Sequence, residues 1–202
     1  MTTTIPLFSW RRAVRGAAPW LACLALCAPP AQAGESLDRL AGLMAERLAL
    51  MDDVAAYKWL HHGAIEDPPR EAALLESLDR CAAARGMGKA RRADARAFFE
   101  AQIGAAKVRQ RAHFAAWKKG TVLPPESAPD LAEEIRPQLD RIGTAMLDTL
   151  PRAWLELQGS TGRAELRSAR RLAGLPPGRE DPAVEAAFAP LCKRAGLTAN
   201  KC

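Results

Sequence analysis

The clearest helical pattern in the chain lies in residues 37–58, LDRLAGLMAERLALMDDVAAYK. Seven of its residues recur at alternating intervals of three and four, a spacing that predicts one seam along an α-helix. The seam consists of Leu37, Leu40, Met44, Arg47, Met51, Val54 and Lys58. Its two cations are about three turns of 3.6 residues apart and therefore point the same way. Because a charge on a core-facing seam is costly unless an anion meets it, the seam predicts a buried acid or an anionic ligand.

The rest of the chain beyond residue 33 is also typical of helices, since Ala, Leu, Arg and Glu dominate and no apolar–polar alternation persists. We expect helices over residues 36–62, 69–85, 89–119, 130–158, 163–172 and 182–195, with a linker at residues 121–129. Asp130 and Glu133 predict a capping box at the start of the fourth helix, and Pro137 and Pro151 are expected to kink or divide that helix. The predicted fold class is all-α, a bundle of about six helices.

The first 33 residues are typical of a secretory signal peptide. Arg11, Arg12 and Arg15 form a positive region, residues 17–28 form an apolar stretch too short to span a bilayer, and Ala31-Gln32-Ala33 is a small-residue cleavage site. We therefore expect residues 1–33 to be cleaved and residues 34–202 to form one periplasmic or secreted domain with no stable membrane anchor. The paired arginines leave export by the twin-arginine route open.

Charge and cysteine content narrow the function classes. The formal net charge is +6, and half of it comes from the three leader arginines. Because no basic patch interleaved with aromatics remains, we expect no nucleic-acid binding. The odd count of Cys81, Cys192 and Cys202 leaves the disulfide pairing open, with Cys192–Cys202 as the local possibility. No Cys/His spacing predicts a metal site, and we expect the adjacent His61 and His62 at a solvated helix end.

A second apolar seam contains an amide. The residues at helical spacing on one face of the predicted helix 89–119 are Phe99, Ile103, Ala106, Gln110 and Trp117. A buried amide needs hydrogen-bond partners, and a lone one is most often structural. Beside Arg47 and Lys58, however, Gln110 becomes a candidate donor to a ligand.

Further charged residues can join this set. Asp67, Arg70 and Glu71 flank the predicted start of the second helix, and Arg136 follows the linker. Each one alone is explained as solvated surface charge. Together, several cations and one amide suit a compact dianion, with arginines binding carboxylates in forked geometry and an ammonium and an amide stabilising charge on one oxygen. The sequence contains no recognisable nucleophile–base pair and no glycine-rich phosphate loop.

These residues resemble the all-helical chorismate mutases. The resemblance rests on residues 47–59 (RLALMDDVAAYKW), on residues 65–71 (IEDPPRE), and on the run from Phe98 through Lys107 to Gln110 and Trp117. The predicted leader and the extra C-terminal helices make the chain similar to the secreted gamma class. The resemblance implies an isomerase that rearranges chorismate to prephenate without a metal or organic cofactor. It also implies a homodimer with a complete site in each chain, in which residues 34–120 form the catalytic helices and residues 130–202 complete the site and the core.

The resemblance implies roles for the residues that match the family's motifs. Arg47 and Arg70 match arginines that bind substrate carboxylates. Lys58 matches a lysine that contacts a carboxylate and the ether oxygen, and Gln110 matches the residue that donates to that oxygen from the opposite side. The catalytic residues implied are therefore Lys58, Gln110 and Arg47.

The remaining substrate-binding positions implied are Asp67, Glu71, Ala106 and Arg136. Asp67 and Glu71 match positions near the ring hydroxyl, Asp67 chiefly through its backbone. Arg136 matches an arginine of the secreted class that replaces one supplied by the partner chain in cytoplasmic relatives. The chain departs from the family pattern at Ala106, where relatives often carry a hydroxyl, at Pro137, and near residue 160, where the first cysteine of the family's C-terminal disulfide is absent.

Two alternative roles for the inward cations stay open. A non-catalytic periplasmic helical module that binds an anionic metabolite or a partner helix needs the same residues. A purely structural bundle needs acids on facing seams, and the nearby Asp52 and Asp53 rotate away from the Lys58 face.

Overall fold

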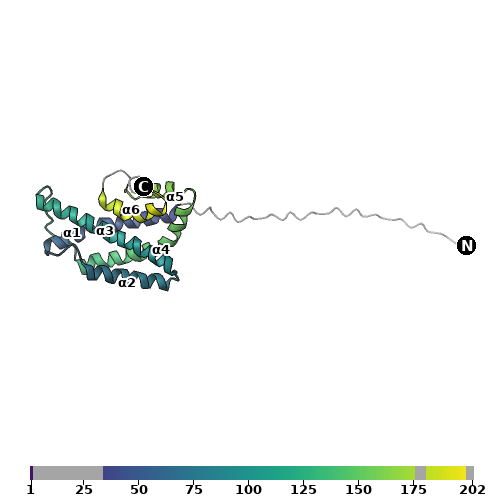
Figure 1. Cartoon of the computed structure of the whole chain (residues 1–202), viewed down its shortest axis with the longest axis horizontal. Helices are drawn as coiled ribbons and strands as arrows, with labels where there is room; N and C mark the ends of the chain where they lie inside the picture. The colour runs from purple at the N-terminus through teal and green to yellow at the C-terminus, as the bar shows by residue number, and fades with distance from the viewer. Residues whose placement is uncertain (2–33, 176–180, 199–202) are drawn as a thin grey trace. The chain divides into compact units, whose positions relative to one another are not determined.

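The computed structural model describes residues 1, 34–175 and 181–198. The chain divides into two units, Met1–Pro30 and Ala31–Cys202, and every described helix belongs to the second unit. Within the described residues there are six α-helices and one short π-helical turn, η1 (Figure 1). They are α1 (Glu35–Leu60), α2 (Pro68–Ala84), α3 (Lys89–Lys119), η1 (Leu131–Ile135), α4 (Arg136–Gln158), α5 (Gly162–Leu172) and α6 (Pro182–Arg194). The predicted all-α class with six helices is therefore confirmed.

The helix boundaries agree with the sequence prediction to within one or two residues, except at the fourth helix. There, residues 131–135 form the π-helical turn and α4 begins at Arg136, with Pro137 in its first turn. A proline is tolerated at this position because the first N–H groups of a helix have no partner within it. Pro137 thus divides the predicted helix, whereas α4 continues through Pro151.

The cap of this fourth segment also differs in one partner. The Asp130 carboxylate accepts hydrogen bonds from the backbone N–H groups of Ala132 and Glu133, both at 2.7 Å. The backbone N–H of Asp130 donates a hydrogen bond to the side chain of Glu134 at 2.9 Å, so the predicted partner, Glu133, was wrong. The π-helical turn explains the change, because its wider winding places the residue four positions along beside the cap.

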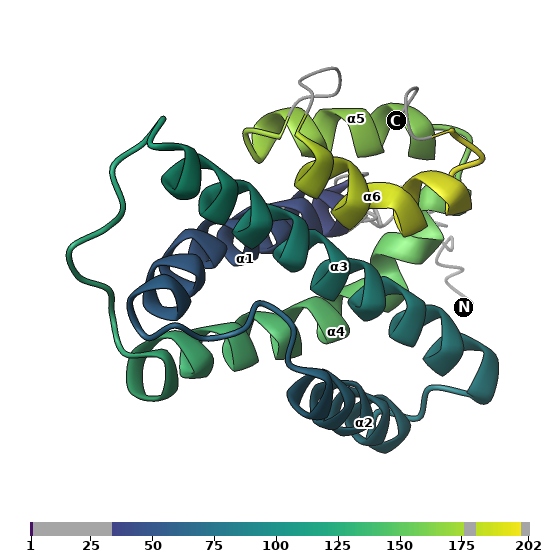
Figure 2. The same cartoon turned by 60° about the vertical axis from the view of Figure 1, so that its left-hand side comes forward.

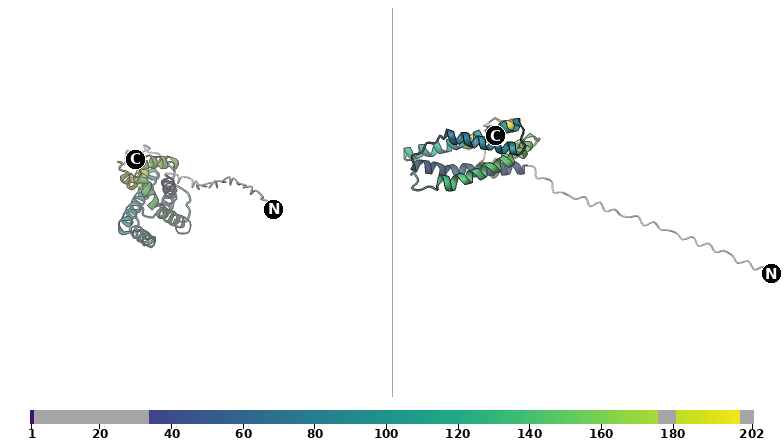
Figure 3. Two further views of the ribbon diagram at one scale, coloured as in Figure 1. Left: turned by 90° about the vertical axis from the view of Figure 1, so that its right-hand side faces the viewer. Right: turned by 90° about the horizontal axis from the view of Figure 1, so that it is seen from below.

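The three longest helices, α1, α3 and α4, form the framework, and the other helices pack on two sides of it. α1 packs against α3, α4 and α5, α3 packs against α6, and α2 packs against α3 and α4. Figure 2 shows α2 on one side of α1, α3 and α4, with α5 and α6 on the other, and the right-hand view of Figure 3 shows the long helices running side by side. None of the described helices has both the length and the apolar character needed to cross a bilayer.

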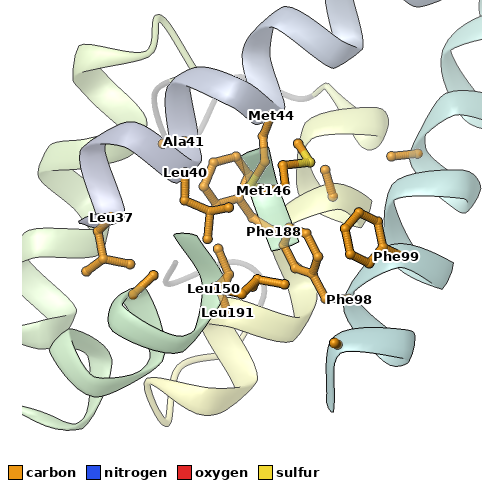
Figure 4. Packing of buried hydrophobic residues seen from close by; sticks show 14 of the residues in the cluster. Leu37, Leu40, Ala41, Met44, Phe98, Phe99, Met146, Leu150, Phe188 and Leu191 are labelled. Atoms are coloured by element: carbon orange, nitrogen blue, oxygen red, sulfur yellow. The ribbon is translucent and has the colours of Figure 1, made fainter. Parts of the chain in front are cut away.

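The main core lies where α1, α3, α4 and α6 meet. Its members include Leu40, Met44, Phe98, Met146 and Phe188, all at most 1% exposed (Figure 4). Burial of apolar side chains such as these stabilises the fold by about 25 cal/mol per Å² removed from water. A second, smaller cluster consists of Met51, Val54, Ala106 and Ile135. The five apolar residues of the α1 seam are all buried, as the spacing predicted.

The described cysteines differ in their bonding, and the two adjacent histidines lie at a helix end. Cys81 is a free cysteine and Cys192 is disulfide-bonded. The predicted partner of Cys192, Cys202, lies outside the described residues. His61 and His62 are exposed at the C-terminal end of α1, which confirms the solvated helix end.

Candidate active site

A cavity of about 150 Å³ lies between α1, α2, α3, η1 and α4. All of the substrate-site residues expected from the sequence line this cavity. They are Arg47, Lys58, Asp67, Arg70, Glu71, Ala106, Gln110 and Arg136. Trp117 does not line it and packs instead on the ring of Trp59, with ring centroids 5.4 Å apart.

Arg47 lies on the core-facing seam of α1 and is only 9% exposed. Its Nε has no hydrogen-bond partner among the described residues. Burial lowers the pKa of Arg47 to about 10, and the charge of Asp140 partly opposes this shift. The guanidinium therefore remains protonated at neutral pH, with donors that the protein does not satisfy.

Lys58 lies three turns further along the same seam and is half-buried. Its Nζ donates a hydrogen bond to the backbone oxygen of Ile65 at 2.7 Å. Burial lowers the pKa of Lys58, while the carboxylates of Asp67 and Glu71 act in the opposite direction. An ammonium has three donors, so two remain for a ligand.

Gln110 faces the cavity from α3 and is 4% exposed. Its Nε2 lies 3.7 Å from the Sδ of Met51, a weak acceptor, and its Oε1 has no partner. A structural amide at this depth would be satisfied by protein groups. The position of Gln110 is therefore suited to a ligand.

The start of α2 places two acids at the rim of the cavity. Asp67 caps the helix by accepting a hydrogen bond from the Arg70 N–H at 3.2 Å, and Pro68 and Pro69 occupy the first turn. Glu71 accepts hydrogen bonds from Lys107 Nζ at 2.9 and 3.2 Å. The Glu71–Lys107 ion pair thus joins the start of α2 to α3.

Arg136 reaches the cavity although Pro137 follows it. The proline sits in the first turn of α4 and leaves the preceding residue free to line the cavity. The charge of Arg136 lowers the pKa of Lys58, which indicates that the two cations face the same space.

Two charged residues of this cavity, Lys107 and Asp140, were not predicted from the sequence. Lys107 follows Ala106 and precedes Gln110 by one helical turn, so its spacing was available as a signal. Asp140 lies four residues after Arg136 on the same face of α4. It could be found only after Arg136 had been placed. The apolar wall includes Val54, Phe99 and Ile103, which belong to the two predicted seams, and also Leu131 and Leu139, which no predicted seam contained.

The charges that line the cavity are unbalanced. Five are cationic and three are anionic, an excess of two positive charges. The cations are Arg47, Lys58, Arg70, Lys107 and Arg136, and the anions are Asp67, Glu71 and Asp140. This excess suits a compact ligand with two negative charges.

Comparison with known proteins places the chain in a family. Residues 37–138 match the family described as chorismate mutase type II. The secreted chorismate mutase of Mycolicibacterium smegmatis is 34% identical over 122 residues, which are 60% of this chain and 65% of that protein. The secreted chorismate mutase of Mycobacterium tuberculosis is 29% identical over 154 residues, 75% of each chain. The match thus spans slightly less than two thirds of the Mycolicibacterium smegmatis relative.

Solved structures of chorismate mutases share the fold. The structure from Burkholderia thailandensis superposes with a TM-score of 0.68 at 36% identity and covers 78% of this chain and 99% of its own. The secreted enzyme from Yersinia pestis superposes with a TM-score of 0.56 at 27% identity and covers 76% of this chain and 94% of its own. From the family match and the shared fold, the chain belongs to the type II chorismate mutases.

Proposed function

We propose that this protein rearranges chorismate to prephenate inside the cavity between α1, α2, α3 and α4. The observation that carries the proposal is a pair of buried polar atoms without hydrogen-bond partners, Arg47 Nε and Gln110 Oε1, on residues that line one cavity with Lys58. Membership in the type II family supports it. The excess of two positive charges also matches the two carboxylates of chorismate.

The rearrangement is unimolecular and needs no nucleophile or proton transfer. The ether C–O bond breaks while a C–C bond forms at the other end of the enolpyruvyl arm. The site must therefore fold the arm over the ring and hold it there. In our proposal, Arg47, Arg70 and Arg136 bind the two carboxylates, and the apolar wall of Val54 and Phe99 excludes water.

Two donors are positioned for the charge that develops during this step. As the C–O bond breaks ahead of C–C bond formation, the ether oxygen becomes negative. We propose that Lys58 and Gln110 approach this oxygen from opposite walls, α1 and α3. Preplaced donors stabilise such charge without reorganisation, and loss of one typically costs about 3 kcal/mol, or hundreds-fold in rate.

The remaining pocket residues orient the substrate in this proposal. Asp67 and Glu71 lie near the ring hydroxyl, Asp67 chiefly through its backbone. Ala106 contributes a small apolar surface where a hydroxyl contact is absent.

We further propose that residues 1–33 direct export and are then removed. The names of the related secreted enzymes support this proposal. The resemblance also implies that residues 34–202 act as a homodimer. The intact mass of the protein recovered from the periplasm tests whether residues 1–33 are removed. A native size measurement of the same protein tests whether it is a homodimer.

The decisive experiment follows the loss of chorismate absorbance with purified protein. We expect turnover in the native protein and at least a hundred-fold lower kcat in Lys58→Ala, with unchanged helical circular dichroism. Lys118→Ala is the matched control, because Lys118 is exposed in the last turn of α3 and does not line the cavity. Near-normal activity of Lys58→Ala would contradict the assigned role.

The same assay separates the alternative function. A protein that binds chorismate but leaves its absorbance unchanged is a non-catalytic module for an anionic metabolite. In that case calorimetry would detect binding, and Lys58→Ala would weaken it without any turnover to lose.

A further inference from the structure

One acid of the cavity, Asp140 on α4, lies among three arginines. The nearest oxygen of its carboxylate is 3.6 Å from Nη2 of Arg70. Its charge raises the pKa of Arg47 against the effect of burial. Arg136 precedes it by one helical turn on the same face of α4. Asp140 is thus the carboxylate that this group of cations shares.

The other two acids of the cavity are already occupied. Asp67 accepts a hydrogen bond from the N-terminus of α2, and Glu71 accepts two from Lys107. Asp140, in contrast, makes no hydrogen bond with its side chain to another described residue, and its 3.6 Å approach to Arg70 is longer than a hydrogen bond. Its side chain is 60% exposed and that of Arg70 is 45% exposed. A pair of this kind is weak and separates readily.

We propose that Asp140 lowers the affinity of the cavity for dianions, because it takes the place of a ligand carboxylate while the cavity is empty. This inference rests on the proposed function, because it requires a ligand with two carboxylates. In the free protein Asp140 compensates the charges of Arg70 and Arg47. When the ligand binds, one of its carboxylates forms the ion pair with Arg70 in place of Asp140, and the Asp140 side chain turns toward solvent. Because substrate and product are both dianions, the competition weakens both and changes the affinity rather than the chemical step.

The test compares Asp140→Asn with Asp148→Asn. Asp148 lies two turns further along α4, has a similarly exposed side chain (54%), and also joins α4 to the α2 segment, through Arg85. It does not line the cavity. The control therefore breaks an ion pair between the same two segments without changing the charge of the cavity.

We expect Asp140→Asn to lower the KM for chorismate by about two- to fivefold, the range for an exposed charge pair. The kcat stays the same or falls slightly, because a retained dianionic product leaves more slowly. The difference from the native protein shrinks at about 0.5 M NaCl, since salt screens exposed charges. Asp148→Asn keeps the native KM. An unchanged or higher KM in Asp140→Asn, or an equal fall in Asp148→Asn, would overturn the inference.

A non-reacting ligand separates this inference from the proposed function. Benzene-1,3-dicarboxylate is added to the native protein and to both variants, and the rise in melting temperature is measured. We expect a larger rise for Asp140→Asn than for the other two proteins. If the native protein leaves chorismate unchanged, the proposed activity fails, yet this larger rise would still uphold the role of Asp140. Equal rises in all three proteins would refute it.

Discussion

Two regions of the molecule each bury one arginine and one glutamine, but the hydrogen-bond partners of these side chains differ between the regions. In the cavity region, Arg47 has an unpartnered Nε and Gln110 an unpartnered Oε1. In the region of α5 and α6, Arg170 is 0% exposed but donates from Nε to the Leu175 oxygen at 3.2 Å and from Nη2 to Glu185 at 2.8 Å. In the same region, Gln102 of α3 donates to the backbone oxygen of Ala187 on α6 at 2.9 Å.

The difference shows that burial of a polar group does not by itself mark a functional site. The guanidinium of Arg170 also lies 4.8 Å from the ring centroid of Phe188, and only its Nη1 lacks a partner. Such a side chain is a structural element of the packing. Arg47 has no hydrogen bond or ion pair to a described residue and borders a cavity. A buried cation left in this state is explained by a ligand.

The largest expected effect is on activity, from Arg47→Met. The kcat/KM for chorismate should fall about a hundred-fold or more, corresponding to about 3 kcal/mol, because a desolvated carboxylate loses its partner. The free energy of unfolding, measured in urea, should stay the same or rise, since an uncompensated buried charge is removed. A large loss of stability with normal activity would show instead that Arg47 has a structural role, as Arg170 does.

The reverse result is expected for Arg170→Met. The free energy of unfolding should fall by about 3 kcal/mol, the low end for a broken buried pair, because the partner Glu185 is partly exposed. The kcat of the folded protein should not change, since Arg170 does not line the cavity. Urea unfolding and the chorismate assay on the same preparation check both parts, and a fall in kcat at native stability would break the distinction between the regions.

Substitution of either buried glutamine tests the difference between the two regions through the pH dependence of the rate. The native enzyme should show a flat rate between pH 5 and pH 8, because Gln110 does not titrate. Gln110→Glu should be at least about tenfold more active at pH 5 than at pH 8, where its carboxyl has lost the proton that it donates.

Gln102→Glu is the matched control for this pH effect. Its side chain faces the Ala187 oxygen and not the cavity. We expect it to lower stability without introducing a pH dependence of kcat. Equal activity of Gln110→Glu at both pH values would argue against contact with the reacting oxygen.

The smallest effect is expected at an ion-pair cluster on α1, α3 and the start of α6. Arg109 donates to both Asp52 oxygens, at 2.9 and 3.3 Å, and to Asp181 at 3.0 Å. Although burial raises it, hydrogen bonds from Arg109 and His113 bring the pKa of Asp52 below its ordinary value. A lowered pKa in the folded state gives stability that is complete above the unfolded value, about 3.9, and is lost as the pH falls through the folded value.

Asp52→Asn should therefore lower the free energy of unfolding at pH 7 by at most about 1 kcal/mol, because the pair is half-exposed. The difference from the native protein should shrink as the pH is reduced from 5 toward 2. The neighbouring Asp53→Asn is the control, because Asp53 has no ion pair with a described residue. A difference that stays constant over this pH range would show that the charge of Asp52 is not its source.

The helices and the cavity residues of α1 and α3 follow from the sequence because their signals are local. The roles of Asp67, Arg70, Glu71 and Arg136 came only from the family resemblance. The 3.6-residue period of α1 and α3 determined which faces turn inward, and the prolines, glycines and capping acids determined where the helices end. Since Arg47 and Lys58 share a face with buried Met44 and Met51, their direction was predictable before any contact was known.

Which inward cations have protein partners depends on how the helices pack, and no local pattern indicates it. Arg170 and Leu166 also lie one turn apart on the buried face of α5, so its spacing resembles that of Arg47. The partners that distinguish the two regions come from separate elements: Glu185 lies on α6, and Ala187 lies 85 residues from Gln102. The same holds for Asp140, which meets Arg70 through the packing of α4 on α2. Periodicity specifies the direction of a side chain on its own helix, whereas the group that it meets depends on how distant helices pack.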